Sequence, residues 1–583
     1  MTRLGRVAAA GLLAAAFLRA GAARADEFDG VEVASRSPWP EKPSGGWAPH
    51  YVDLENRTDE ERHVRVEAES LWGDVFQVTK SVRLAPRERT RLDLVAPVFP
   101  PFGSSLQVRV SVAGGRKRYL STTSTSSFGV EDVRDVLLVA SRPPAAGDPE
   151  RFASDLAAAS GPAATGGHRA HRVTHVRPED LPSRPEPYTS VRLVVLDSSG
   201  DWPQGAALEA LVSAVRAGAR IAIHGDGALE KAKGVPGLRE FLEERFLDRE
   251  AVGAECFHAG FGLIRVRGGA RPFEDALDIE AFRALAEPPP WGGLVPVAGY
   301  RAHGGAREAV FDALPVRTMT ALLLLFSLLM VFGNRAVVKR TRRPALLLVT
   351  VPVAGCIASG AFLAYGLFYQ GLDVKVAAST LAILDQRTHR VAACERRDLF
   401  AGLSPGAGLR PAAGTMVLGH REASWDRSDR FTVNLDEGTL LSGSFIPVRQ
   451  PIRQTILRDA ASRARLDLRL DGDALVAENA LGTTVLSLVA RDPAGAYHAL
   501  DVPLAPGATA RLERADGEAA GAYPWSAMAE FGLEFEEKLP PGSYAAVVAQ
   551  AVFRDPLGIE VNEISGAHAV VGILDASEEA WRR

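Results

Sequence analysis

Residues 318–333 read TMTALLLLFSLLMVFG and residues 344–372 read PALLLVTVPVAGCIASGAFLAYGLFYQGL, and this pair of apolar runs decides the architecture. Apolar runs of more than about 18 residues are typical of membrane spans, because no soluble core needs one so long. The first run has 16 residues and reaches only about 24 Å as a helix, so we expect the arginines at its ends to snorkel. We therefore predict a transmembrane hairpin over 316–372, with spans at about 318–336 and 345–369.

The segment that joins the two runs is basic, and residues 335–343 contain no acidic residue. An excess of Lys and Arg marks the cytoplasmic side of a span. The chain is thus predicted to cross the bacterial inner membrane, turn in the cytoplasm and cross back, which leaves both flanks on the periplasmic side. The residues that predict this topology are Arg335, Lys339, Arg340, Arg342 and Arg343.

The second run contains pairs of small residues spaced four apart, which let membrane helices approach closely. The pairs are Gly355 with Ser359 and Gly360 with Ala364. They would pack within the hairpin or against another membrane protein, and the sequence leaves both interpretations open. The run carries no charged residue, which argues against transport through this chain itself.

The N-terminus is predicted to be a signal peptide over residues 1–25. Arg3 and Arg6 begin it, an apolar stretch follows at 7–18, and Ala-Arg-Ala at 23–25 provides a cleavage site. An uncleaved anchor is the alternative, and either one would export the residues that follow.

Composition narrows the classes of function. The net charge of -4 gives no indication of a nucleic-acid partner. The 55 glycines and 37 prolines favour turns and β-rich modules over long helical bundles. Three cysteines are too few for a disulfide framework: Cys356 lies in the second span, whereas Cys256 and Cys394 lie in the flanks, and their pairing stays open.

The flank before the hairpin is predicted to hold two domains. Residues 26–130 consist of short, alternating apolar and polar segments between turn residues, a pattern typical of a β-sandwich. In residues 131–275, compact apolar runs at 135–140 and 191–196 alternate with helical segments, one of them expected around 238–247. Such runs suit buried parallel strands, so we predict an open α/β sheet.

Residues 276–315 are predicted to be a linker, and the chain after the hairpin is again β-patterned. We expect a β-rich region over 373–460 and a β-sandwich-like domain over 461–583, with one larger unit as the alternative. Both flanks share the order asparagine, then a turn, then a strand, at 54–56 and 477–479, which indicates a weak structural repeat. The predicted fold class is a multidomain α+β membrane protein, combining a β-sandwich, an open α/β sheet, two transmembrane helices and a C-terminal β-sandwich-like region.

Polar residues follow the predicted strands of the α/β sheet. Asp197 and Ser198 come after one strand, and His224 and Asp226 come after the next. Ligands of open α/β sheets bind outside the carboxyl ends of the strands, where Asp, Ser and His could build an acyl-transfer site. The alternative is that Asp and Ser cap the following helix while His224 fills a turn.

We predict no metal and no cofactor. His168, His171 and His175 have suggestive spacing, but a glycine-rich loop running into a strand would not bring their rings together. The sequence also contains no P-loop, no dinucleotide fingerprint and no zinc-type cysteine pair.

Residues 191–227, VRLVVLDSSGDWPQGAALEALVSAVRAGARIAIHGDG, give the α/β segment its resemblance to the class I glutamine amidotransferase-like fold. Members of that family carry a nucleophilic Cys in a Gly-x-Cys-x-Gly elbow, with a later His and Glu. This segment has no such elbow, and Cys256 follows a predicted helix rather than a core strand. The resemblance therefore implies a binding or scaffolding platform and not amidotransferase activity.

A wider resemblance covers the middle of the chain. Residues 342–371, then TLAILD at 380–385 and LFAGLSPGAG at 399–408, are similar to a family of uncharacterised bacterial envelope proteins. That resemblance implies a signal peptide, exported β and amidotransferase-like regions, a membrane hairpin and β-rich exported tails.

The expected function is that of a membrane-anchored envelope protein whose exported, non-catalytic domains bind a protein partner or envelope component. Its expected partners are the lipid bilayer and an envelope protein, and not nucleic acid. Two alternatives remain: a divergent hydrolase or transferase that uses the α/β edge, and an accessory subunit of a transport or surface-assembly complex.

Overall fold

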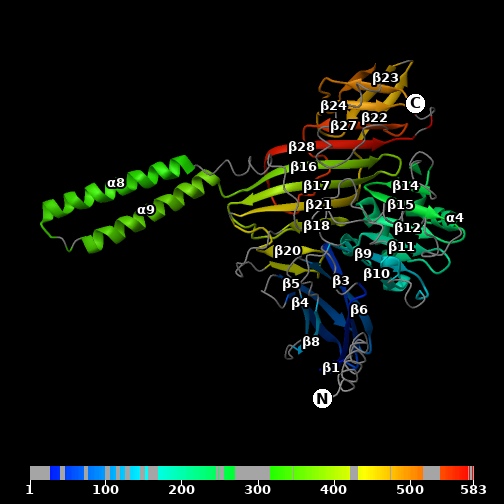
Figure 1. Cartoon of the computed structure of the whole chain (residues 1–583), viewed down its shortest axis with the longest axis horizontal. Helices are drawn as coiled ribbons and strands as arrows, with labels where there is room; N and C mark the ends of the chain where they lie inside the picture. Colours follow the sequence, from blue (N-terminus) through cyan, green and yellow to red (C-terminus); the bar gives the residue numbers. More distant parts are fainter. Residues whose placement is uncertain are drawn as a thin grey trace.

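A computed structural model of the chain contains four β-sheets and a projecting helical hairpin (Figure 1). It describes residues 26–39, 46–70, 76–98, 105–112, 118–124, 132–144, 151–154, 169–243, 247–248, 255–268, 316–343, 345, 347–420, 431–448, 450–472, 474–515, 539–575, 577 and 581. The predicted signal peptide over 1–25 and the linker at 276–315 lie outside these residues. The described chain is rich in β-sheet and has few helices, as a multidomain α+β fold requires.

The N-terminal sandwich consists of two sheets. The first has the order β1-β2-β3-β6, and the second has the order β20-β19-β5-β4-β7-β8. The strands are β1 (Asp26–Phe28), β2 (Val31–Arg36), β3 (Gly46–Asn56), β4 (Arg62–Ser70), β5 (Phe76–Leu84), β6 (Arg89–Val98), β7 (Ser105–Val112), β8 (Arg118–Ser124), β19 (Phe431–Asn434) and β20 (Leu440–Gly443). Alternating residues such as Val64, Val66 and Ala68 of β4 are buried, so period-2 patterning places one face of each strand in the core.

Strands β19 and β20 come from the chain after the hairpin. β19 pairs in parallel with β5, from Phe431 opposite Phe76 to Asn434 opposite Thr79. These residues belong to the β-rich region predicted over 373–460, but they complete a sheet of the N-terminal sandwich, because a local pattern shows that a strand forms but not which sheet it joins.

The α/β sheet has the order β10-β9-β11-β12-β15-β14-β13, in which the first five strands are parallel and the last two antiparallel. Its elements are β9 (Asp132–Val139), β10 (Arg169–Val176), η1 (Pro178–Asp180), η2 (Glu186–Ser190), β11 (Leu193–Asp197), α3 (Gly205–Arg216), β12 (Arg220–His224), α4 (Ala228–Lys233), α5 (Pro236–Arg239), β13 (Leu247–Asp248), β14 (Glu255–Ala259) and β15 (Gly262–Arg267). In chain order the parallel strands run 2-1-3-4-5, one of the two common doubly wound orders.

The helix expected around 238–247 is wrong. α4 precedes that range, α5 covers only its first two residues and ends at Arg239, and Leu247–Asp248 is a strand. Gly234 follows α4 and Pro236 opens α5, so helix-breaking residues divide the segment earlier than its apolar pattern indicated.

After the hairpin, eleven strands form one continuous sheet in the order β18-β21-β17-β16-β28-β27-β24-β25-β26-β23-β22. They are β16 (Val374–Asp385), β17 (Arg390–Ala401), β18 (Thr415–His420), β21 (Pro451–Ala461), β22 (Arg465–Asp471), β23 (Ala474–Ala480), β24 (Val485–Arg491), β25 (Tyr497–Leu500), β26 (Thr509–Ala515), β27 (Ser543–Val548) and β28 (Asn562–Ile573). Leu466 and Leu475 at one end share a core with Leu384 and Val570 from the middle, so the sheet folds over on itself.

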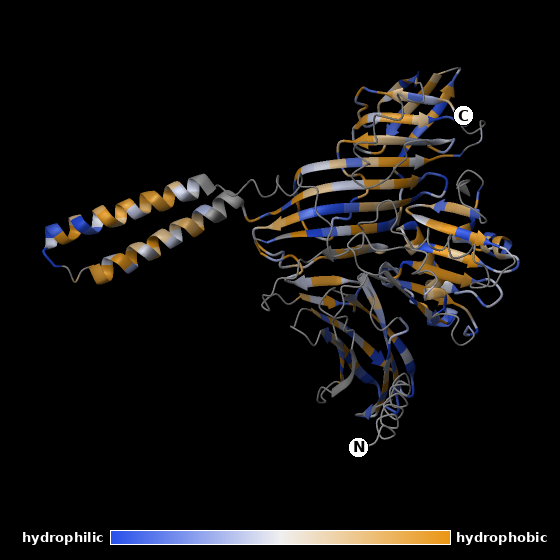
Figure 2. Cartoon of the chain, viewed as in Figure 1, coloured by the Kyte–Doolittle hydropathy of each residue, from blue (hydrophilic) through white to orange (hydrophobic). Residues whose placement is uncertain are grey.

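The hairpin consists of α8 (Val316–Thr341) and α9 (Leu347–Gln370). Both helices are long and apolar enough to cross a membrane, and Figure 2 shows them as apolar rods away from the rest of the molecule. α8 continues to Thr341, so Arg335, Lys339 and Arg340 lie on the helix and not in the expected loop. No Gly or Pro occurs between Arg335 and Pro344, and cations in a last helical turn interact favourably with the helix dipole.

The paired small residues do not hold the hairpin together. A Cβ added at Gly355 or Gly360 would meet no atom within 4 Å, so neither glycine packs against α8. Instead, Thr350 Oγ1 donates a hydrogen bond to Asn334 Oδ1 at 3.1 Å. Of the two interpretations of Gly355, Ser359, Gly360 and Ala364, only packing against another membrane protein stays a prediction.

Asn56 ends β3 with its side chain fully buried. Its Nδ2 donates to Glu60 O at 2.7 Å and to Ala85 O at 2.9 Å, while its Oδ1 accepts from Thr58 N at 3.0 Å. One amide therefore ties the turn after β3 to the loop before β6.

Asn479 has the same role after the hairpin. It is fully buried, and its Nδ2 donates to Thr483 O at 2.8 Å and to Leu504 O at 2.9 Å. The acceptor loops both read Leu-Ala-Pro, at 84–86 and at 504–506. The predicted repeat is confirmed, and it extends to the Leu-Ala-Pro loops that accept these hydrogen bonds.

We expect Asn56→Ala and Asn479→Ala each to lower the free energy of unfolding by about 1–3 kcal/mol, because each leaves buried carbonyls without a donor. Asn434→Ala is the control, since the Asn434 side chain is only half-buried and accepts from Asp436 N at the surface. Guanidinium unfolding of the full chain in mild detergent measures the three changes. A loss at Asn434 as large as the other two would contradict this role.

Candidate functional site

The edge of the α/β sheet is where its fold would place a ligand. With the order 2-1-3-4-5, the switch point lies between β9 and β11, at their carboxyl ends. The chain emerges there at Ser141 and at Asp197. The structure brings the predicted residues together, since Asp197 pairs with His224 on adjacent strands.

The loop after β11 folds back over this switch point. Asp197 Oδ1 accepts from Ser199 N at 2.8 Å, and Ser198 Oγ donates to Asp226 O at 3.2 Å. Ser141 Oγ accepts from Asp201 N at 2.9 Å, which closes the loop across the strand ends. Each of these oxygens thus fixes the backbone of the loop. The expected helix caps are wrong, because the N-caps of α3 and α4 are Gln204 and Gly227 and neither has a side-chain cap, and His224 lies on β12 and not in a turn.

Lys231 of α4 closes the loop from the opposite side. Its Nζ donates to Ser198 O at 2.8 Å and to Gly200 O at 2.6 Å, and lies 5.3 Å from the centre of the Trp202 ring. Ser198 is 5% exposed, so its hydroxyl does not face solvent as a nucleophile would.

His224 is fully buried. Burial, and then the cations Arg265 and Arg267, lower the pKa of His224 to about 3, against an opposing effect of Asp197. The imidazole is therefore neutral near pH 7 and lies below the surface of the edge. Asp226, by contrast, is exposed.

We expect acid to destabilise the fold through His224 and His50, whose pKa burial lowers to about 4. Both are neutral in the folded state, but unfolded His takes up a proton below its ordinary pKa of about 6.5. Their contribution is complete above pH 6.5 and falls by about 1.4 kcal/mol per pH unit for each His as the pH drops towards their folded pKa values. Unfolding curves across this range measure the slope, and His224→Gln should make it shallower. An unchanged slope in that variant would contradict a neutral, buried His224.

The other sequence candidates lie apart from this edge. His175 Nε2 donates to Ala140 O at 2.8 Å, and His168 lies outside the described residues. Cys256 lies on β14 and Cys394 on β17, and both are buried and form no disulfide. Among the described residues no group of three or more His, Cys, Asp or Glu side chains could hold a metal ion.

Sequence reasoning missed a buried polar network on the eleven-stranded sheet. Thr380, Glu395 and His568 lie directly opposite one another on β16, β17 and β28. Thr380 Oγ1 lies 2.8 Å from His568 Nδ1, and His568 Nε2 lies 3.0 Å from Glu563 Oε1. The polar residues within these strands were the only signal, including the charged run at 395–398, and they do not reveal that the strands are neighbours.

Two arginines extend this network. Arg554 donates through Nε to Glu395 at 2.9 Å and through Nη1 to Glu563 at 2.7 Å, while Arg397 lies 3.4 Å from Glu395. The adjoining cavity, lined in part by Thr380 and Cys394, has a volume of about 10 Å³, roughly one water molecule. The network therefore binds the β27–β28 connection to the sheet and leaves no room for an organic substrate.

Comparisons with known proteins assign no family. No family model and no curated protein match the chain. Among solved structures it is similar to the yeast delta-COP-I mu-homology domain, at 9% identity over 35% of this chain and 96% of that one, with a TM-score of 0.17. It is also similar to a calcium-binding mutant of Bacteroides uniformis beta-glucuronidase 2, at 9% identity over 33% of this chain and 23% of that one, with a TM-score of 0.13. TM-scores this low carry no argument about fold or function.

Proposed function

We propose that this chain is an inner-membrane-anchored envelope protein whose non-catalytic, exported body binds a protein partner or an envelope component. The hairpin α8–α9 is the anchor. The body comprises the sandwich, the α/β domain and the eleven-stranded sheet, and lies on the periplasmic side. In this proposal the α/β domain is amidotransferase-like in fold and serves as a platform.

The observation that carries the proposal is that both flanks of the hairpin form one body. One hydrophobic core includes Val33 and Val95 from before the hairpin together with Leu418 and Ile456 from after it. Two segments that share a core lie on the same side of any membrane that the hairpin enters. The hairpin is therefore an insertion in the chain of a single folded body, as expected for a membrane anchor.

The arrangement at the α/β edge supports a binding role over catalysis. The loop at the switch point is held by its own hydrogen bonds and by Lys231, and His224 is buried beneath it. General acid–base catalysis needs a base within reach of the substrate proton, and Ser198 and His224 are buried away from solvent.

Two measurements on the full chain in membranes test this function. Chemical crosslinking from the periplasmic side should yield a discrete adduct with another envelope component. Any turnover of model ester, amide and glycoside substrates should be unchanged in the variants Asp197→Asn and His224→Gln. Asp201→Asn is the control in the same loop. Turnover that the first two variants abolish and the third preserves would overturn the non-catalytic assignment, and crosslinking that recovers only monomers would overturn the binding role.

A further inference from the structure

Four large apolar side chains are exposed at one end of the eleven-stranded sheet. They are Leu372 at 54% exposure, Leu403 at 52%, Val448 at 45% and Ile564 at 42%. Most exposed large apolar side chains of the described residues belong to the hairpin, and on the body Leu486 of β24 and Val502 after β25 are exposed as well. The four side chains at the sheet end form a set of their own, because they lie on neighbouring strands. We call this set the apolar rim.

The register of the strands places the rim on four neighbouring strands. The order is β21-β17-β16-β28. Leu372 precedes β16, Leu403 follows β17, Val448 forms a bridge with Ala401 before β21 begins, and Ile564 is near the start of β28. Val374 pairs with Ala401, so the start of β16 and the end of β17 are the same end of the sheet.

This end is also where the chain leaves the membrane helix. α9 ends at Gln370 and β16 begins at Val374, so only three residues separate helix and strand. The junction is tightly packed: a Cβ added at Gly402 would lie 2.2 Å from Gly371 O. Asn562 Nδ2 also donates to Asp373 Oδ2 at 3.0 Å, which ties the junction to β28. The sheet is therefore held close to the end of α9, as Figure 1 shows.

The length of α9 sets the depth of the rim. Its 24 residues span about 36 Å, whereas the hydrocarbon core of a bilayer is about 30 Å thick. With its first residue at the cytoplasmic boundary, the last turn of α9 reaches the headgroup region on the far side. The hydrogen bond from Asn562 lowers the pKa of Asp373, so this carboxylate stays charged and keeps the rim at headgroup level.

We propose that the apolar rim docks the body onto the surface of the same bilayer that holds the hairpin. The occupant of the rim is the boundary between headgroups and acyl chains, where exposed Leu, Ile and Val side chains are removed from water. Docking fixes the orientation of the body relative to the membrane. This inference rests on the proposed anchor role of the hairpin.

Quenching of site-specific bimane labels by nitroxide-bearing lipids tests the docking in nanodiscs. The native Cys356 reports on hairpin insertion, while Ser404→Cys, beside the rim, and Thr388→Cys are made in a Cys356→Ala background. Thr388 lies in the turn after the 12-residue strand β16, about 36 Å beyond the rim at 3.3 Å per residue. We expect loss of fluorescence at 356 and 404 and none at 388.

A variant with a polar rim distinguishes docking through the four side chains from simple tethering by the hairpin. It replaces Leu372, Leu403, Val448 and Ile564 by Ser, at exposed positions where the fold should tolerate the change. We expect the polar rim to decrease the quenching of the label at 404. The same four substitutions in the chain that keeps Cys356 should leave the quenching at 356 unchanged.

Each other outcome has one meaning. If the label at 356 is quenched and the label at 404 is not, the docking is overturned and the anchor role of the hairpin is retained. The same result is expected if a protein, and not the bilayer, covers the rim. Equal quenching at 404 with the polar rim overturns the role of the four side chains. A label at 356 that is not quenched overturns the anchor role of the hairpin, and the docking with it.

Discussion

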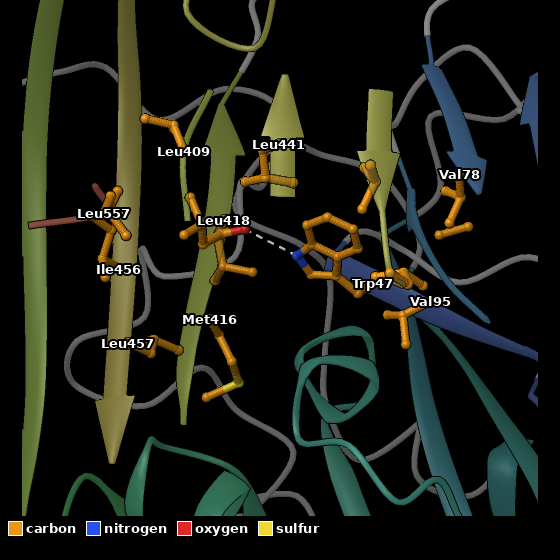
Figure 3. Close-up of a cluster of buried hydrophobic side chains, with 14 of the residues drawn as sticks. Trp47, Val78, Val95, Leu409, Met416, Leu418, Leu441, Ile456, Leu457 and Leu557 are labelled. Carbon is orange, nitrogen blue, oxygen red and sulfur yellow. Dashed lines mark hydrogen bonds between the residues drawn. The ribbon is translucent and has the colours of Figure 1, made fainter. Parts of the chain in front are cut away.

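Trp47→Ala is expected to lower the free energy of unfolding by about 3–5 kcal/mol, because it removes a large buried side chain from a packed core. The Trp47 side chain is 5% exposed and packs in the core shared by both flanks. Figure 3 shows its indole between Val95 and Leu418, with a hydrogen bond to a backbone oxygen of β18. That bond runs from Trp47 Nε1 to Val417 O at 3.0 Å. Guanidinium unfolding of the full chain in mild detergent gives the change.

Trp47 also reaches the third part of the body, since its backbone N donates to Thr189 Oγ1 of η2 at 3.1 Å. Trp47→Phe keeps most of the ring contacts but leaves Val417 O without its donor, which should cost about 1–2 kcal/mol. Trp39 is the control: it is as buried, and its Nε1 donates to Ser190 Oγ at 2.8 Å, within the flank before the hairpin.

The same variants test the junction itself. With a specific protease site inserted between Arg342 and Arg343, the two halves of the wild-type chain should stay together after cleavage. Trp47→Ala should weaken that association and Trp39→Ala should not. Halves of the wild-type chain that separate on cleavage would contradict a shared core.

Glu395→Ala is expected to destabilise the fold by about 3–5 kcal/mol, the cost of leaving a buried cation without its partner. Arg397 is 1% exposed, and burial lowers its pKa. Its remaining hydrogen-bond acceptor among the described contacts would be Asp555 O, at 3.5 Å. Arg554 would lose its bond to Glu395 as well but would keep Glu563.

The chain contains a matched control for this change. Arg465 and Asp467 form the same pairing of residues two apart on one strand, but with 60% and 45% of their side chains exposed. Because water screens this pair, Arg465→Ala should cost only about 0–1 kcal/mol. The loss of unfolding free energy, measured from unfolding curves, should be several-fold larger for Glu395→Ala than for Arg465→Ala. Similar losses would mean that the buried network contributes no more than a surface ion pair.

The sequence predicted the parts of this fold that depend on local pattern. The length and charge of the apolar runs predicted α8 and α9, and the compact run at 191–196 predicted a buried strand that the structure places at the centre of the α/β sheet. Local pattern also predicted the repeat at Asn56 and Asn479. Each of these features is determined by residues that are close together in the sequence.

What the sequence could not predict is pairing between distant segments. Nothing local to Phe431 indicates that it joins β5, some 350 residues earlier in the chain. The network around Glu395 depends on strands that meet only in the folded sheet, so nothing in the sequence indicated that its residues contact one another. At the α/β edge, residue type predicted either a site or a helix cap, whereas the hydrogen bonds show that these side chains fix the backbone of the loop.

The most direct test of one anchored body is the side of the membrane on which each flank lies. Single cysteines at the exposed positions Asp59, Asp501 and Arg343 can be introduced in a Cys356→Ala background, since Cys256 and Cys394 are buried. In spheroplasts, a membrane-impermeant maleimide should label Asp59→Cys and Asp501→Cys, and should label Arg343→Cys only after permeabilisation. Labelling of one flank but not the other would contradict the account, because two segments on opposite sides of a membrane cannot share a core.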